Sequence, residues 1–171
     1  SNQSFASERW KKDAAKALVN LMRHVSSKPY GKRIIGWHIA YGVCGETCLW
    51  GRCGREYGDY SRVFQKTFIQ WGKKRYGSHE RLLDAWGTLE MPPPAMRKDV
   101  YDSVDAFLRK RPCDVIVRDL DIFMSELNSS IAEFFCKTVK DESPDALTGL
   151  FYGYILQCGD SAYTGWLGLD R

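Results

Sequence analysis

Apolar residues recur three and four positions apart in five stretches of the chain, a spacing that predicts α-helices. The stretches cover residues 5–25, 60–76, 82–86, 96–108 and 120–139. Ser7 is expected to cap the first helix and Asp59 the second, because each offers a side-chain oxygen just before an apolar stripe. Gly77-Ser78, Gly87 and Ser143-Pro144 are expected to end helices.

Two other stretches, residues 34–41 and 147–156, are almost continuously apolar. Short runs of this kind, bounded by turn residues, predict strands that are covered on both faces, as in a parallel sheet. A long helical crossover separates them, and two strands cannot make a closed sheet. We therefore expect an α/β fold in which residues 1–171 form a single domain that is a fragment of a larger protein.

Composition narrows the classes of partner. The hydrophobic content of 44% and charged content of 27% are typical of a globular domain. The net charge of +4 comes without a basic block, so we expect no nucleic-acid partner. The chain has no charged-then-apolar leader and no apolar run near the roughly 20 residues of a membrane span, so we expect no membrane partner. We also expect no cofactor.

Aromatic residues are abundant, at 13% of the chain with six Trp and nine Tyr. Carbohydrate sites use such rings, because the apolar face of a sugar stacks on a ring while its hydroxyls find polar partners. Core packing is the alternative explanation for any single tryptophan.

Three of the six cysteines, Cys44, Cys48 and Cys53, fall within ten residues. Their spacing lacks the paired Cys-x2-Cys of structural zinc sites, so no metal is expected. A zinc- or disulfide-stabilised interaction domain built on them remains an alternative. Cys113 and Cys136 lie in apolar settings and are expected to be buried thiols.

Glu46 lies just beyond the C-terminal end of the first predicted strand. Chemistry in parallel sheets collects at these strand ends, which makes Glu46 the leading candidate for a catalytic group. The alternative is a loop carboxylate that pairs with Arg52 or Arg55. The lysines and arginines along Arg62 to Arg75 are interpreted as a solvated helix face.

Several motifs resemble those of β-galactosidase-like glycoside hydrolases. They are Gly36-Trp37-His38-Ile39-Ala40-Tyr41-Gly42, Gly45-Glu46, Asp59-Tyr60-Ser61, Phe68-x2-Trp71-x4-Tyr76-Gly77-Ser78, Leu83-x-Ala85-Trp86-Gly87 and Phe151-Tyr152-Gly153-Tyr154. The chain is similar to family 42 and its wider clan, and the segment from Phe64 to Gly87 is the most specific part. The resemblance implies a partial (β/α)8 (TIM) barrel, from the helix before its fourth strand to the loop after its fifth.

The resemblance also implies retaining hydrolysis of β-glycosides by two carboxylates, with Glu46 as the acid/base. The family ends this strand in Asn-Glu, and a direct register places Tyr41 and Gly42 there, so the role of Glu46 assumes a variant loop. The nucleophile would follow a seventh strand that this chain does not reach, and Asp160 does not match it. The isolated chain is therefore expected to be inactive.

Five residues at or beyond the strand ends are expected to contact an oligosaccharide or glycoside substrate. They are His38, Tyr41, Trp50, Tyr152 and Tyr154. For His38 the alternative is a hydrogen-bonded core group, and Tyr154 would equally pack beneath the strand ends. The alternative function for the whole chain is a non-catalytic carbohydrate-binding or degenerate barrel fragment.

Overall fold

The computed structural model describes residues 3–42, 59–87 and 115–151. Helices account for 69% of these residues. The elements, in chain order, are α1 (Glu8–Ser26), the 3-10 turn η1 (Gly31–Arg33), β1 (Gly36–His38), α2 (Arg62–Tyr76), α3 (His79–Trp86), α5 (Val115–Glu142) and β2 (Leu147–Gly149). The predicted helix over residues 96–108 lies outside the described residues.

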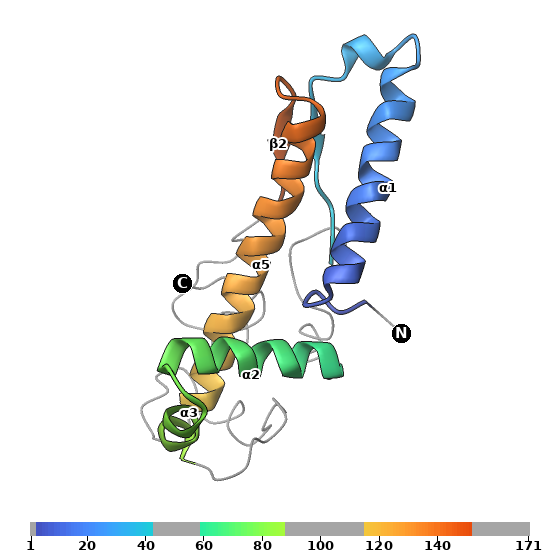
Figure 1. Ribbon diagram of the computed structural model, residues 1–171. Helices are drawn as coiled ribbons and strands as arrows, with labels where there is room; N and C mark the ends of the chain where they lie inside the picture. Colours follow the sequence, from blue (N-terminus) through green and yellow to red (C-terminus); the bar gives the residue numbers. More distant parts are fainter. Residues whose placement is uncertain (1–2, 43–58, 88–114, 152–171) are drawn as a thin grey trace.

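The long helix α5 is the centre of the described structure. It packs against α1 and β2 toward its C-terminal end and against α2 and α3 toward its N-terminal end (Figure 1). Its apolar stripe supplies much of the core, as the period from Leu120 to Val139 predicted. The core residues of α5 are Leu120, Phe123, Met124, Leu127, Ile131, Phe135 and Val139. On α2, Phe64 and Phe68 pack their rings against Phe123 at 5.3 Å between centroids.

Local capping chemistry sets the helix ends. The Ser7 hydroxyl accepts from the Trp10 amide at 3.2 Å, which confirms Ser7 as the cap of α1. Gly77 ends α2 with a φ of 85°, in the left-handed region that glycine tolerates. Gly87 ends α3 in the same region. The predicted helix ends at these two glycines are confirmed.

The prediction that Asp59 caps α2 is wrong, because Ser61 holds that position. The Ser61 hydroxyl accepts from the Phe64 amide at 3.1 Å. Asp59 acts one step earlier: its carboxylate accepts from the Ser61 amide at 2.9 Å and from the Ser4 hydroxyl at 2.6 Å. It thereby joins the segment before α1 to the start of α2.

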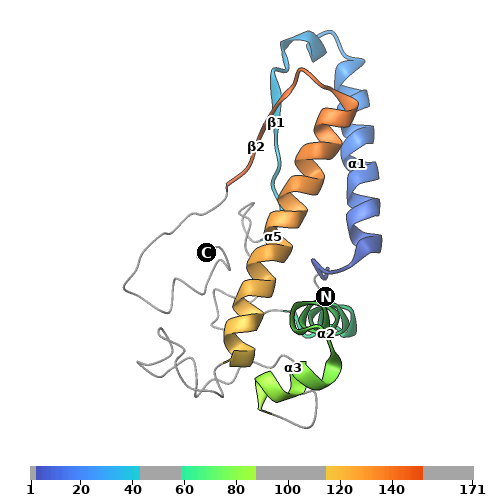
Figure 2. The same cartoon turned by 60° about the vertical axis from the view of Figure 1, so that its left-hand side comes forward.

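The two strands pair in parallel, with Gly36 opposite Leu147 and His38 opposite Gly149 (Figure 2). Parallel pairing was predicted, but both strands are only three residues long within the described part of the chain. Full coverage of the first strand was a wrong prediction, since the Ile35 side chain just before β1 is 77% exposed.

The expected partial (β/α)8 barrel is not what the structure shows, and that fold class is wrong. The described residues are mostly helical, with two short parallel strands and no alternation of strands with helices. The physical difference lies in what the helices cover. In a barrel each helix packs on the sheet, whereas here α2 and α3 pack on each other and on α5.

Candidate functional site

A groove of about 560 Å³ lies between α1 and the segment that contains β1. Its lining combines β1 and the residues that follow it with one side of α1. The lining residues are Gln3, Trp10, Ala14, Leu18, Leu21, Trp37, His38, Ile39, Ala40, Tyr41, Gly42 and Phe135. Two of the residues predicted to bind substrate, His38 and Tyr41, are thus brought together, and the groove adds Trp10 and Trp37.

Packing fixes the aromatic walls of this groove. Trp10 stacks on Phe5 at 5.2 Å between centroids and meets the edge of Phe135 at 5.8 Å. Tyr41 is buried, and its hydroxyl donates to the backbone carbonyl of Asn128 at 3.3 Å. Because this hydroxyl is engaged by α5, Tyr41 contributes ring surface to the groove.

His38 is exposed, so it is not a core group. Its ring meets the edge of Phe151 at 4.6 Å. The lining is mostly apolar, with Gln3 and His38 as residues whose side chains can donate and accept hydrogen bonds. Because His38 follows Trp37 in β1, its imidazole leaves the opposite face of the strand and borders the groove from its exposed edge. The arrangement suits a ligand that has both an apolar face and polar groups, and the lining residues include no carboxylate for acid/base chemistry.

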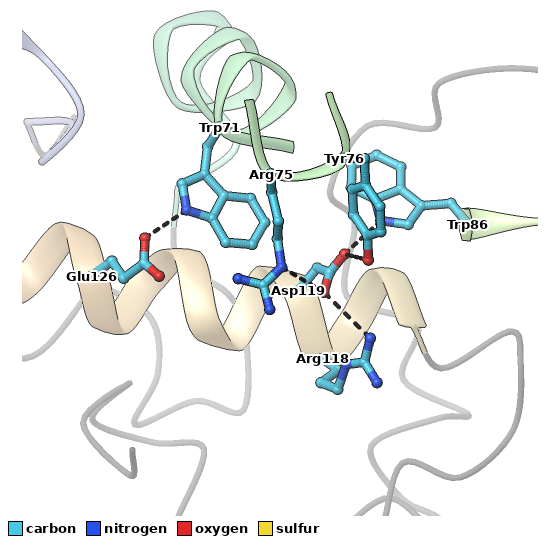
Figure 3. Close-up of polar contacts among 7 residues, drawn as sticks. All are labelled: Trp71, Arg75, Tyr76, Trp86, Arg118, Asp119 and Glu126. Carbon is cyan, nitrogen blue, oxygen red and sulfur yellow. Dashed lines mark hydrogen bonds and ion pairs between the residues drawn. The ribbon is translucent and has the colours of Figure 1, made fainter. Parts of the chain in front are cut away.

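A second polar cluster lies at the junction of α2, α3 and α5, where Asp119 is fully buried (Figure 3). One carboxylate oxygen, Oδ2, accepts from the Tyr76 hydroxyl at 2.6 Å and from the Trp86 indole N–H at 2.9 Å. The three helices are therefore joined through one buried atom. This cluster explains two positions of the motif between Phe68 and Gly87: Tyr76 and Trp86 hold the helices in place.

The other oxygen of Asp119, Oδ1, has cations nearby but no hydrogen bond. Arg118 Nη2 lies 3.7 Å from it and Arg75 Nε lies 4.0 Å away. Burial, followed by the hydrogen bond to Asp119, raises the pKa of Tyr76 above its ordinary value of 10.0. The phenol therefore stays protonated as the donor that the carboxylate requires.

Trp71 extends the row of contacts along α5. Its indole donates to Glu126 at 2.6 Å, and the Arg75 guanidinium lies 5.2 Å from its ring centroid. Sequence reasoning missed this cluster and interpreted Arg75 as part of a solvated face. One signal was available in the sequence: an aspartate at position 119, directly before the apolar period of α5. The other was a set of aromatic residues whose polar atoms require partners when buried.

The remaining predicted site residues lie outside the described residues. They are Glu46, Trp50, Tyr152, Tyr154 and the cysteines Cys44, Cys48 and Cys53. Cys136 is half-buried and free. Among the described residues, no group of three or more His, Cys, Asp or Glu side chains is arranged to hold a metal ion.

Comparisons with known proteins give no match: no family model, no curated protein and no solved structure resembles the chain. The similarity to β-galactosidase-like hydrolases therefore rests on the motifs quoted above and stays a prediction. Within the described ranges, no helix is long and apolar enough to span a bilayer.

Proposed function

We propose that this chain recognises a β-glycoside in the groove between α1 and β1, as part of a protein that hydrolyses glycosides. The observation behind the proposal is that Trp10, Trp37, His38 and Tyr41 all line one groove. Its volume lies within the range of about 300 to 1,000 Å³ that small-molecule sites occupy.

The chemistry of the lining favours a sugar over a purely apolar ligand. Trp37 is half-buried, so its ring is held by packing but still offers surface for the apolar face of a pyranose. The His38 imidazole and the Gln3 amide are available for ring hydroxyls, which both accept and donate.

Hydrolysis needs two carboxylates, and we assign the acid/base role to Glu46 on the strength of the motif resemblance. In a form of the protein that also supplies the second carboxylate, Glu46→Gln should slow hydrolysis of glycosides with poor leaving groups. Activated aryl glycosides should be almost unaffected, because their departure needs little protonation. An unaltered rate on the poor leaving group would remove Glu46 from this role.

Binding is testable on the chain itself by titrating tryptophan fluorescence with methyl β-galactoside and β-linked galacto-oligosaccharides. Trp37→Ala should weaken binding by roughly tenfold, the scale of one aromatic contact. Trp37→Phe should restore much of it by keeping a flat ring. His38→Ala should also weaken binding.

The matched control is His24→Ala, which removes an exposed imidazole from α1 that does not line the groove. It should leave affinity unchanged. The proposal fails if His24→Ala and His38→Ala weaken binding equally, or if no β-galactoside binds. Binding without any hydrolysis in the form that supplies both carboxylates would favour the non-catalytic alternative.

A further inference from the structure

One end of the molecule combines exposed apolar side chains with cations. It lies opposite α2 and α3, where α1 ends, η1 turns into β1, and α5 passes into β2 (Figures 1 and 2). We call this end the basic apolar tip and define it by the following residues: Lys28, Tyr30, Lys32, Arg33, Ile34, Ile35 and Leu147.

The apolar part of the tip is unusually exposed. The exposed fractions are 51% for Tyr30, 43% for Ile34, 77% for Ile35 and 64% for Leu147. The Leu147 amide donates to the Ile35 carbonyl at 2.9 Å, so the two residues lie at the same end of the sheet. Leu147 is opposite Gly36, which places the Ile35 and Leu147 side chains on opposite faces of that end. Large aliphatic side chains gathered at one exposed place mark an interaction surface.

The charge of the tip has one sign. The sequence contains no Asp or Glu between Asp13 and Glu46. Within the described part of the chain, Lys28, Lys32 and Arg33 form no ion pair. Their positive charges are therefore available to an external partner.

Acids on the neighbouring end of α5 do not neutralise these cations. Glu142 forms a bidentate ion pair with Arg23 at 2.8 Å, and Asp141 forms an ion pair with Lys137 at 2.8 Å. Asp145, exposed in the turn before β2, is the remaining acid there. One carboxylate against three cations leaves a net positive tip.

We propose that the basic apolar tip docks the protein on an anionic lipid bilayer. The sequence-based expectation of no membrane partner rested on leaders and spanning segments, neither of which surface docking requires. Ile34, Ile35 and Leu147 would enter the boundary between headgroups and acyl chains, and Tyr30 would lie at headgroup level. The cations would contact lipid phosphates and carboxylates. A lipid surface fits better than an acidic protein, because these residues stand on a protruding turn that enters a headgroup layer but offers few contacts to a protein.

Co-sedimentation with vesicles tests this proposal, comparing phosphatidylcholine alone with phosphatidylcholine plus phosphatidylserine. The chain should bind only the anionic vesicles, and added salt should weaken binding. The double variant Lys32→Ala/Arg33→Ala should lose about fivefold in affinity per cation removed. Ile35→Asn should weaken binding while leaving the chain folded, because that side chain is already in solvent.

The matched control is Lys73→Ala/Lys74→Ala, which removes the same charge from the last turn of α2 at the other end of the molecule. Binding should be nearly unchanged. Equal loss in the two double variants would overturn the proposal, since it would mean attraction by net charge alone. Absence of vesicle binding, or binding of a poly-glutamate peptide in place of vesicles, would also overturn it, the latter in favour of an acidic protein partner.

Discussion

Burial, rather than hydrogen-bond length, should determine how much two similar contacts stabilise the fold. The Trp86 indole donates to Asp119 at 2.9 Å, and the Trp71 indole donates to Glu126 at a shorter 2.6 Å. Asp119 is fully buried, whereas Glu126 is exposed. The two contacts therefore form a matched pair: hydrogen-bond length predicts that the Trp71 contact stabilises the fold more, and burial predicts that the Trp86 contact does.

Asp119→Ala leaves the buried Trp86 N–H without an acceptor, which costs about 1 to 3 kcal/mol. The Tyr76 hydroxyl also loses its acceptor, but it is half-buried and costs about 1 kcal/mol at most. Arg75 and Arg118 are 41% and 43% exposed, so water solvates them once the carboxylate is gone. The expected loss in the free energy of unfolding is about 1 to 4 kcal/mol.

Glu126→Ala should cost about 1 kcal/mol or less, because water replaces the carboxylate at the surface. Urea unfolding followed by far-ultraviolet circular dichroism measures both losses, provided that the denaturant dependence is unchanged. Tyr76→Phe, which removes one donor and keeps Asp119, should fall between them. Equal losses for Glu126→Ala and Asp119→Ala would show that burial does not determine how much these contacts stabilise the fold.

Three further predictions concern pH and the sheet. The hydrogen bond from Arg23 lowers the pKa of Glu142, so the pair should stabilise the fold at pH values above the ordinary carboxyl pKa. This stabilisation should be lost as pH falls through the folded-state pKa. The difference in unfolding free energy between wild type and Glu142→Gln should therefore disappear in acid. The raised pKa of Tyr76 has the opposite consequence: its contribution to stability is complete below pH 10.0 and is lost as pH rises through the folded-state pKa. In a near-ultraviolet phenolate titration, Tyr76→Phe should therefore remove a tyrosine that ionises above pH 10.0. Gly36→Ala places a Cβ 2.6 Å from the Leu147 carbonyl oxygen and should cost about 1 to 3 kcal/mol. Gly149→Ala, whose nearest contact is the His38 ring at 3.4 Å, should stay within about 0.5 kcal/mol in the same urea assay; equal losses would show that this close approach does not matter.

The helices were predictable because their signals are local. An apolar stripe three and four residues apart, a serine before it and a glycine after it lie within one segment, and α2 and α3 show all three signals. The helix α1 has the stripe and the serine, and α5 has the stripe. The cap of α2 was predicted at the wrong residue because Asp59 and Ser61, two positions apart, both have side chains that can cap a helix. The aspartate satisfied the Ser61 amide, and Ser61 then capped the helix.

The sequence by itself also determined the positions and the parallel direction of the two strands, and it placed Trp37, His38 and Tyr41 on one segment. It did not determine what covers that segment. The apolar character of Ile35 predicts burial, but burial depends on neighbours supplied by other elements, and among the described residues Ile35 has few.

Tertiary structure alone decided the groove and the buried carboxylate. Trp10 and Tyr41 line one groove because α1 packs on α5. One carboxylate oxygen of Asp119 accepts from donors 43 and 33 residues away, on α2 and α3. No local sequence pattern shows which distant residues will come into contact. A periodic stripe shows that one face will be buried, whereas the free energy of a buried charge or an aromatic wall depends on which distant side chains face it.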